Sequence, residues 1–470
     1  MRALRPDVVA FTATTPLFNQ VRDMSWIVKG ISPDIVTIAG GAHPTALPEL
    51  SLRQARLDLV AVGEADFLLA DLLDGRDPSL LGGVARLVDD AYVPAVPGHL
   101  LEDLDHLPLP AWDAYPGALD QRMSRVIARH QPVTTMEFSR GCLFRCDFCA
   151  SKNTMGYGYR KKSPERCAEE LVRLGRLGFR EVILTDDIFT SDAEWASAVC
   201  EEIIRRKPGV AWTCSNGIRV DSTDTDLFPL LRAAGCYRVC FGFESGNDEV
   251  LRSFGKGGRA SLDQGRAAVR AARAAGLEPD GLFMVGLSAD TEASMADTLA
   301  FAKEVELDAI KCGICTPYPG TPYFDQLHAS GRIRTYDWDA YSVWNKAEAI
   351  YEHPTLSWPT IIAAFDRFYS DAYLRNPRYL LRRARFILRN RELWENVRFT
   401  LEGWRAMRAG TTDLHTNAYR HEQGWRPSDA SAATEITPTK PPKAATGTGP
   451  TGRNNRVVLA PRSVAGHAAR

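Results

Sequence analysis

The sequence has no apolar run that approaches the ~20 residues needed for a membrane-spanning helix. It also has no excess of one charge, because 57 basic side chains stand against 58 acidic ones. This balance argues against a protein built mainly to neutralise nucleic acid or an anionic membrane. Residues 1–7 show no basic segment followed by an apolar one, so no secretory signal is expected. Together these absences predict a cytoplasmic protein with no membrane span and no nucleic-acid partner.

Ten cysteines occur among the 470 residues. In a reducing cytoplasm, cysteines are more often ligands, catalytic groups or core residues than members of a disulfide framework. The length exceeds the roughly 250–300 residues that a single core holds, so two or three domains are expected. A hydrophobic content of 45% is typical of globular domains.

Residues 1–100 alternate strand-like and helix-like segments. Strands are predicted at residues 7–11, 34–39 and 57–62, with a helix at 18–30. This rhythm predicts a small parallel α/β sheet, and the low number of strands suggests a domain incomplete at its amino end. Unusual residues follow each strand, at 12–15, 40–45 and 63–64. Open α/β sheets bind ligands at that edge, although the same pattern would also suit a generic fold without a ligand.

A proline-rich stretch at residues 101–131 predicts a linker. Residues 132–335 then repeat strand and helix. The predicted strands lie at 133–138, 181–184, 210–214, 238–243, 280–285 and 309–314, and helices are predicted at 164–177 and 262–275. Six such units predict a partial (βα)6 barrel, whose chemistry would lie at the carboxyl ends of its strands.

Residues 336–427 are predicted to be helical, with basic and aromatic residues mixed at 379–386 and 394–408. A basic amphipathic helix can dock on a membrane surface or on nucleic acid, but it can equally be a solvated face that covers a core. Residues 428–470 are rich in Ala, Thr, Pro, Gly and Lys, which predicts a disordered tail.

The strongest local signal is the spacing C-x3-C-x2-C formed by Cys142, Cys146 and Cys149, directly after the first strand of the predicted barrel. Thiolates are soft ligands that suit iron–sulfur clusters or zinc. Three ligands on a four-iron cube leave one iron open to a substrate. A structural zinc site takes four ligands, and the nearest further thiol, Cys167, is not at zinc-finger spacing.

This motif, with Phe148 just before its last cysteine, resembles the signature of the radical S-adenosylmethionine (SAM) enzymes. The resemblance covers residues 132–335. It implies that the three cysteines hold a 4Fe–4S cluster, whose open iron binds the amino and carboxylate groups of SAM. One electron then cleaves SAM to methionine and a 5′-deoxyadenosyl radical. By the same resemblance, Phe148 would lie near the adenine.

Two later segments resemble the SAM-binding pattern of that family. Phe241 to Gly246 resembles a G-x-E-S-G element, which implies that Glu244 and Ser245 lie near the amino group or ribose of SAM. A carboxylate can pair with an ammonium group independently of any resemblance. Arg219 could hold the methionine carboxylate in a bidentate way. The alternative for each segment is a loop turn or a surface ion pair.

The first domain resembles that of the cobalamin-binding subgroup of radical SAM enzymes. The loops at residues 39–45 and 62–66 are close to its G-G-x-H-P-T and G-E-x-D/E loops. The implied cobalamin contacts are Thr14, Gly40, Gly41, His43, Thr45, Gly63 and Glu64. His43 also has a simpler explanation as a turn residue beside Pro44. The sequence contains no D-x-H-x-x-G element that would supply an axial histidine.

The resemblance implies a cobalamin-dependent methyltransferase acting on an unactivated carbon of a natural-product, lipid or pigment intermediate. Cobalamin would receive its methyl group from one SAM, and a second SAM would supply the radical. The electrons would come from an external one-electron reductant such as flavodoxin or ferredoxin. An alternative keeps the radical without cobalamin, as a dehydratase, epimerase or oxidase of a sugar-like substrate. A third hypothesis, a non-catalytic cluster protein, is disfavoured because such a cluster would normally be fully ligated by protein.

Overall fold

A computed structural model describes residues 5–98, 100–115, 117–120, 123, 127–254, 260–346, 349–390, 394, 397 and 401. The predicted tail at 428–470 and most of the predicted helix at 394–408 lie outside these residues. The described chain forms two compact units: residues 5–98 and 100 with the short segment Asp337–Asp339, and the remainder. None of the helices formed by the described residues has the length and apolar character needed to cross a membrane.

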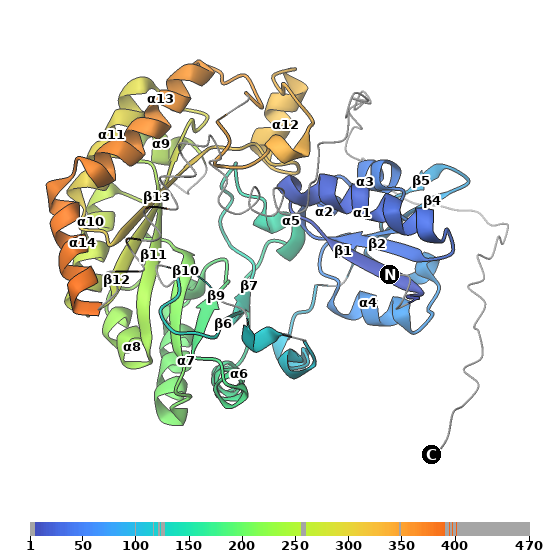
Figure 1. Ribbon diagram of the computed structural model, residues 1–470, viewed down its shortest axis with the longest axis horizontal. Helices are drawn as coiled ribbons and strands as arrows, with labels where there is room; N and C mark the ends of the chain where they lie inside the picture. Colours follow the sequence, from blue (N-terminus) through green and yellow to red (C-terminus); the bar gives the residue numbers. More distant parts are fainter. Residues whose placement is uncertain are drawn as a thin grey trace. The chain divides into compact units, whose positions relative to one another are not determined.

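The first unit is built on a five-stranded sheet in the order β1-β2-β3-β4-β5 (Figure 1). Its strands are β1 (Val8–Thr12), β2 (Val36–Gly40), β3 (Leu59–Ala61), β4 (Val84–Val88) and β5 (Ala91–Val93). The first three strands are parallel, as the alternating pattern predicts. Helices α1 (Phe18–Ile31), α2 (Ala42–Ala46) and α3 (Pro48–Ala55) lie on one side of the sheet, and α4 (Asp66–Leu73) lies on the other.

Strands β4 and β5, which were not predicted, run antiparallel to their neighbours and extend the predicted parallel sheet. Asp89 and Asp90 form the turn between them and both have positive φ, 48° and 64°. Two such residues give the turn geometry that matches the twist of a hairpin. A turn without glycine or asparagine gives a weak signal in the sequence, which explains why this hairpin was not predicted.

The second unit is built on an open six-stranded sheet in which every neighbouring pair is parallel. In spatial order the strands are β6 (Val133–Met136), β9 (Glu181–Leu184), β10 (Ala211–Ile218), β11 (Cys236–Glu244), β12 (Glu278–Val285) and β13 (Ala309–Ile314). This order confirms the predicted partial barrel, because β6 and β13 do not pair with each other.

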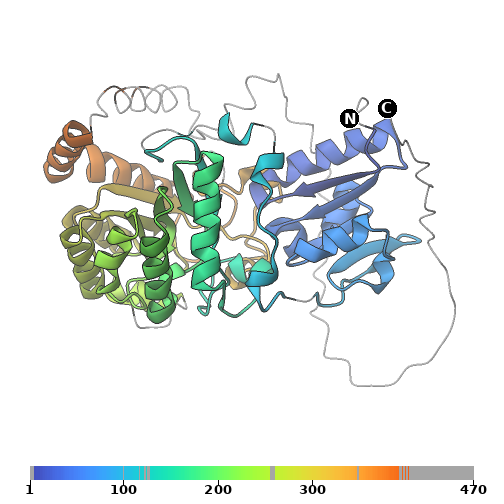
Figure 2. The same cartoon turned by 90° about the horizontal axis from the view of Figure 1, so that it is seen from below.

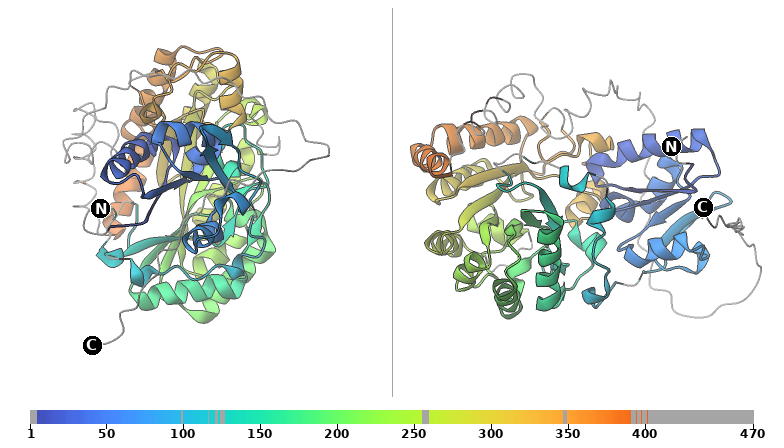
Figure 3. Two further views of the ribbon diagram at one scale, coloured as in Figure 1. Left: turned by 90° about the vertical axis from the view of Figure 1, so that its right-hand side faces the viewer. Right: turned by 60° about the horizontal axis from the view of Figure 1, so that its bottom comes forward.

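Helices cover the outer face of this curved sheet (Figures 2 and 3). They are α6 (Pro164–Leu177), α7 (Ala193–Arg206), α8 (Leu227–Ala233), α10 (Leu262–Ala274) and α11 (Glu292–Glu304). Ser163 begins α6 by accepting a hydrogen bond from Arg166 N, and Ser261 begins α10 with a capping box. Phe243 stacks on Phe283 with ring centroids 5.3 Å apart in the core below the helices.

The edge of the sheet at β13 is covered by α13 (Trp358–Tyr369) and the π-helical turn Ser370–Leu374, which precede α14 (Pro377–Asn390). The Tyr369 hydroxyl accepts a hydrogen bond from Cys312 N and donates one to Cys312 O, at 3.0 and 2.8 Å. The Tyr373 hydroxyl accepts a hydrogen bond from Ile310 N at 2.9 Å. These side chains satisfy backbone groups that an exposed edge strand would otherwise present for pairing.

Candidate functional site

The cysteine motif lies on the loop that follows β6 and the short strand β7 (Ser139–Arg140). Strand β7 pairs antiparallel with β8 (Arg160–Lys161), which closes the far end of the loop. Parallel strands place their carboxyl ends at one edge of a sheet, so the loops after β9, β10 and β11 leave from the same edge as the motif. The segments predicted to bind SAM therefore belong to one side of the second unit.

Two carboxylates at the end of β9 hold the start of the cysteine loop. Asp186 accepts hydrogen bonds from Phe138 N at 2.8 Å and from the Ser139 hydroxyl at 2.5 Å. Asp187 accepts one from Gly141 N at 3.2 Å. Burial raises the pKa of Asp186 to about 7 and also raises that of Asp187. Through these hydrogen bonds the two carboxylates support the start of the cysteine loop.

Gly141 occupies a position that needs glycine, because its φ is +84° and a Cβ would lie 2.5 Å from the backbone oxygen of Gly158. The loop therefore passes directly against the segment that leads into β8. This close approach fixes the path of the chain immediately before Cys142.

Cys142, Cys146 and Cys149 are all free thiols and are all half-buried. Cys149 N donates to Cys146 O at 3.2 Å, so the last part of the motif is a tight turn. Burial raises the pKa of Cys142, which favours the thiol until a metal displaces the proton. Within the described residues, no three His, Cys, Asp or Glu side chains are arranged to hold a single metal ion. A structural zinc site takes four ligands, whereas three thiolates on a four-iron cube leave one iron open, so this set of three thiols fits a cluster better than zinc.

The two residues between Cys146 and Cys149 fix the loop to the rest of the second unit. Phe148, predicted to lie near the adenine, packs against Phe254 with ring centroids 5.3 Å apart. Asp147 N donates to Phe254 O, and Asp147 O accepts from Tyr323 N, both at 3.1 Å. Burial raises the pKa of the Asp147 carboxyl to about 6.

Arg219 lies beside the cysteine loop, as predicted from its place after β10. Its Nη1 is 3.7 Å from Cys146 Sγ, and its guanidinium lies 3.6 Å from the ring centroid of Phe144. However, Nε and Nη2 already donate to both carboxylate oxygens of Asp221, at 2.9 and 2.7 Å. The guanidinium edge expected to hold the methionine carboxylate is therefore paired within the protein. A contact between Arg219 and SAM stays a prediction, and the observed geometry places Arg219 as a cation beside the cluster ligands.

The two residues predicted to bind SAM after β11 differ in exposure. Glu244 is half-buried and has a φ of +59°. Its Oε1 lies so close to Gly242 that a Cβ added at that position would be only 2.7 Å away. Ser245 is fully buried, and its hydroxyl lies 3.3 Å from the Thr298 hydroxyl and accepts from Asn247 N at 3.2 Å. The observed contacts give Ser245 a supporting role in the loop. Contact of either residue with SAM stays a prediction.

In the first unit, hydrogen bonds join the loops after the three parallel strands. Ala13 N donates to Gly40 O at 3.0 Å, and His43 N donates to Ala13 O at 3.1 Å. The Thr45 hydroxyl accepts from Gly63 N at 3.1 Å. The predicted cobalamin loops therefore form one connected edge, although Thr45 uses its hydroxyl within that edge. Contacts of all seven predicted residues with cobalamin stay predictions.

Glycine at position 41 is required by this edge, since its φ is +92° and a Cβ would lie 2.7 Å from the Thr12 hydroxyl oxygen. Thr14 is exposed, and Gly40, Gly63 and Glu64 are half-buried. A tight edge of half-exposed glycine backbone suits a flat macrocycle, so these residues fit the approach of a corrin ring.

His43 is fully buried in the first unit. Its ring stacks on Phe18 at 4.2 Å and meets the edge of Trp338 at 4.7 Å, and its Nδ1 is 3.3 Å from the Thr15 hydroxyl. Among the described residues, nothing hydrogen-bonds to its buried Nε2. Burial lowers the pKa of His43 to about 3, so the imidazole is neutral at physiological pH.

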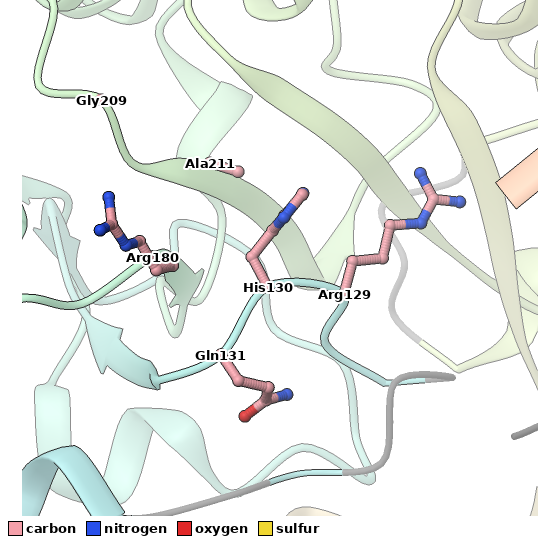
Figure 4. A pocket seen from close by; sticks show the side chains of 6 residues that line it. All are labelled: Arg129, His130, Gln131, Arg180, Gly209 and Ala211. Carbon is pink, nitrogen blue, oxygen red and sulfur yellow. The ribbon is translucent and has the colours of Figure 1, made fainter. Parts of the chain in front are cut away.

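A separate cavity of ≈ 440 Å³ lies at the amino ends of the strands in the second unit's sheet (Figure 4). Gln131 precedes β6, Arg180 precedes β9, and Gly209 and Ala211 flank the start of β10. The side chains in Figure 4 do not converge on one point, and Arg129 forms an ion pair with Glu278. Its position at the amino ends of the strands separates this cavity from the cysteine loop.

Comparisons with known proteins agree with this geometry. The family model of the radical SAM superfamily matches residues 136–302, and that of the B12 binding domain matches residues 1–73. An uncharacterized methyltransferase of Pyrococcus horikoshii is 31% identical over 343 residues, which cover 72% of each chain. The chain is a radical SAM enzyme with a B12-binding domain. Its cofactors are a 4Fe–4S cluster, SAM and cobalamin.

Two further proteins place this radical SAM enzyme among its relatives. An anaerobic magnesium-protoporphyrin IX monomethyl ester cyclase of Rubrivivax gelatinosus is 29% identical over 351 residues, covering 72% of this chain and 61% of the cyclase. The radical SAM methyltransferase TsrM of Kitasatospora setae superposes with a TM-score of 0.59 at 18% identity, over 70% of this chain and 66% of TsrM. The second likeness supports the fold alone.

Replacing Cys146 with alanine removes one of the three predicted thiolate ligands. We expect Cys146→Ala to lose the cluster after anaerobic reconstitution, and with it all cleavage of SAM. Iron content and the release of 5′-deoxyadenosine measure both effects. Cys240→Ala is the matched control, because Cys240 is buried in β11 outside the loop and should retain iron. A fully active Cys146→Ala protein would falsify the assignment.

The buried neutral His43 predicts a specific pH dependence of stability. The pKa of His43 is about 3 in the folded protein, whereas that of an ordinary histidine is 6.5. Between these two pH values only the unfolded chain binds a proton at His43. The contribution of neutral His43 to the free energy of unfolding is therefore fully present above about pH 6.5. It is lost as the pH falls below this value, by ~1.4 kcal/mol per pH unit. Urea unfolding of wild type and His43→Gln should show stabilities that converge on acidification. Parallel pH profiles for the two proteins would contradict the assignment, and His106→Gln, an exposed histidine, serves as the control.

Proposed function

We propose that this enzyme is a cobalamin-dependent methyltransferase that acts on an unactivated carbon of a small molecule. The observation that carries the proposal is the pairing of two features in one chain. One is a three-cysteine loop fixed at the carboxyl edge of a radical SAM sheet, and the other is a B12-binding unit whose three ligand loops are joined by hydrogen bonds. We assign residues 1–100 to cobalamin binding and residues 132–335 to radical chemistry.

When bound, the cluster and cobalamin supply reductive cleavage of SAM and carriage of a methyl group, respectively. The residues of the chain hold and shield these groups. Cys142, Cys146 and Cys149 are proposed as the three cluster ligands. Arg219 offsets negative charge at Cys146, since its Nη1 faces that sulfur at 3.7 Å. The half-buried carboxylate of Glu244 is proposed to pair with the ammonium group of SAM.

The overall reaction balances with two molecules of SAM and two electrons from an external one-electron donor such as flavodoxin or ferredoxin. One SAM gives up its methyl group and becomes S-adenosylhomocysteine. The other takes one electron and is cleaved to methionine and a 5′-deoxyadenosyl group, which removes a hydrogen atom from the substrate carbon. The carbon gains the methyl group, and the removed hydrogen leaves in 5′-deoxyadenosine. The second electron is needed because SAM gives up its methyl group as a cation equivalent, which must gain one electron to bond to a carbon radical.

For the substrate we propose an intermediate of a natural-product, lipid or pigment pathway. The relative from Rubrivivax gelatinosus is named for a magnesium-porphyrin, and TsrM is described with tryptophan as its substrate. This chain spans 61% of the first of these proteins and 66% of the second, so the substrate class is part of the proposal. The cobalamin-independent dehydratase, epimerase or oxidase is not favoured, because the B12 model matches the first 73 residues.

The decisive test uses SAM with a deuterated methyl group and the fully reconstituted enzyme. The candidate substrates are tryptophan and a magnesium-porphyrin, each supplied with a one-electron reductant. We expect one of them to gain an intact trideuteromethyl group, with S-adenosylhomocysteine and 5′-deoxyadenosine released in equal amounts. Mass spectrometry of substrate and co-products measures all three species.

One result would overturn the proposal and would leave the radical SAM assignment intact. Release of 5′-deoxyadenosine without S-adenosylhomocysteine, and with a product that carries no deuterium, would indicate direct radical chemistry. Enzyme reconstituted without cobalamin is the matched control, and it should form no methylated product.

A further inference from the structure

Helix α14 (Pro377–Asn390) presents an unusual face to the second unit. Tyr379 faces inward, with 7% of its surface exposed and its ring 4.8 Å from that of Tyr373. Arg382 lies on the same side, and its Nη2 donates to Leu307 O at 3.2 Å. The inward side of this helix therefore includes an aromatic and a basic side chain.

The leucines of the same helix face solvent. Leu380, Leu381 and Leu388 are 46%, 54% and 72% exposed, and Leu374, in the turn before the helix, is 70% exposed. Leu381 and Leu388 are seven residues apart and therefore lie on one face of the helix. A surface helix normally turns its apolar side toward the core, so this exposed apolar face is available to a partner.

Basic side chains flank this apolar face. Between Pro377 and Asn390 the sequence has five arginines and no acidic residue. Arg378 and Arg385 are exposed and, seven residues apart, form a row beside the leucines. The nearest acidic side chain in the preceding turn, Asp371, is already paired with Arg367 and Arg375. The exposed face formed by the described residues of α14 is therefore positively charged.

Three described positions beyond α14 are also apolar and exposed. Trp394, Val397 and Leu401 are 80%, 40% and 47% exposed and have the i, i+3, i+7 spacing of one helical face. Tryptophan is enriched where protein meets the interface of a bilayer. Exposed leucine and tryptophan bordered by arginine form the pattern of helices that lie in the plane of a membrane surface.

We propose that α14 docks the enzyme on an anionic lipid surface. Leu381 and Leu388 enter the boundary between headgroups and acyl chains, and Arg378 and Arg385 pair with lipid phosphates. Nucleic acid would use the arginines but leave the leucines uncovered, and an apolar protein groove would leave the arginines unpaired. Figures 1 and 2 show α14 at the periphery of its unit. The proposal rests on this helix and does not depend on the proposed methyl transfer.

The test is cosedimentation of the full-length reconstituted enzyme with large vesicles. We expect binding to phosphatidylcholine vesicles that contain phosphatidylglycerol to exceed binding to pure phosphatidylcholine by about tenfold or more. The double variant Leu381→Glu, Leu388→Glu should lose this binding. Both leucines are exposed, so its iron content and circular dichroism should match those of wild type.

Two controls separate a docking face from general stickiness. Leu73→Glu with Leu80→Glu changes two leucines that are 59% and 83% exposed in the first unit, and this variant should bind vesicles as wild type does. Arg378→Gln with Arg385→Gln should remove the preference for phosphatidylglycerol. Equal binding of the Leu381/Leu388 variant and wild type, or no binding of wild type, would overturn the proposal. So would a concentration-dependent dimer that the same leucine variant abolishes, since α14 would then contact a second copy of the chain.

Discussion

The site edge of the second unit depends on the hydrogen bonds that two carboxylates accept from the start of the cysteine loop. Asp186 is buried, yet its two oxygens receive the Phe138 amide and the Ser139 hydroxyl, and Asp187 receives the Gly141 amide. Without these acceptors the chain would leave β6 with unpaired backbone donors beside the core, which is costly. The bonds fix the direction in which the loop starts, and the glycine at position 141 then allows the close turn that presents the three thiols.

Both units follow the same rule, in which parallel strands position polar loops at their carboxyl ends. In the first unit the loops are joined to one another, through Thr45 and Gly63 and through Ala13 and Gly40. In the second unit the loop that carries the cysteines is joined to the next strand. Such internal pairing makes each edge rigid before any ligand arrives, which lowers the conformational cost of binding a large cofactor.

Buried strands were the most predictable feature, and residues 181–184 and 309–314 match the expected strands at both ends. Their apolar runs carry the signal locally. The cysteine motif and the glycine loops were also evident, since their spacing is short. The pairings of polar side chains were not evident. Ser245 faces Thr298, 53 residues further along the chain, so this pairing depends on which segments the fold brings together. Arg219 pairs with Asp221 only two residues away, and this pairing depends on the conformation that the chain adopts after β10.

The central claim is that one chain carries both a cluster and cobalamin, and metal stoichiometry tests it most directly. The protein would be reconstituted anaerobically with iron, sulfide and hydroxocobalamin, desalted and analysed for metals. The account predicts about four irons and about one tightly held cobalt per chain, as expected for a single cube and a single corrin. Four irons without cobalt would contradict the role of the first unit, and retention of neither metal would contradict the account as a whole.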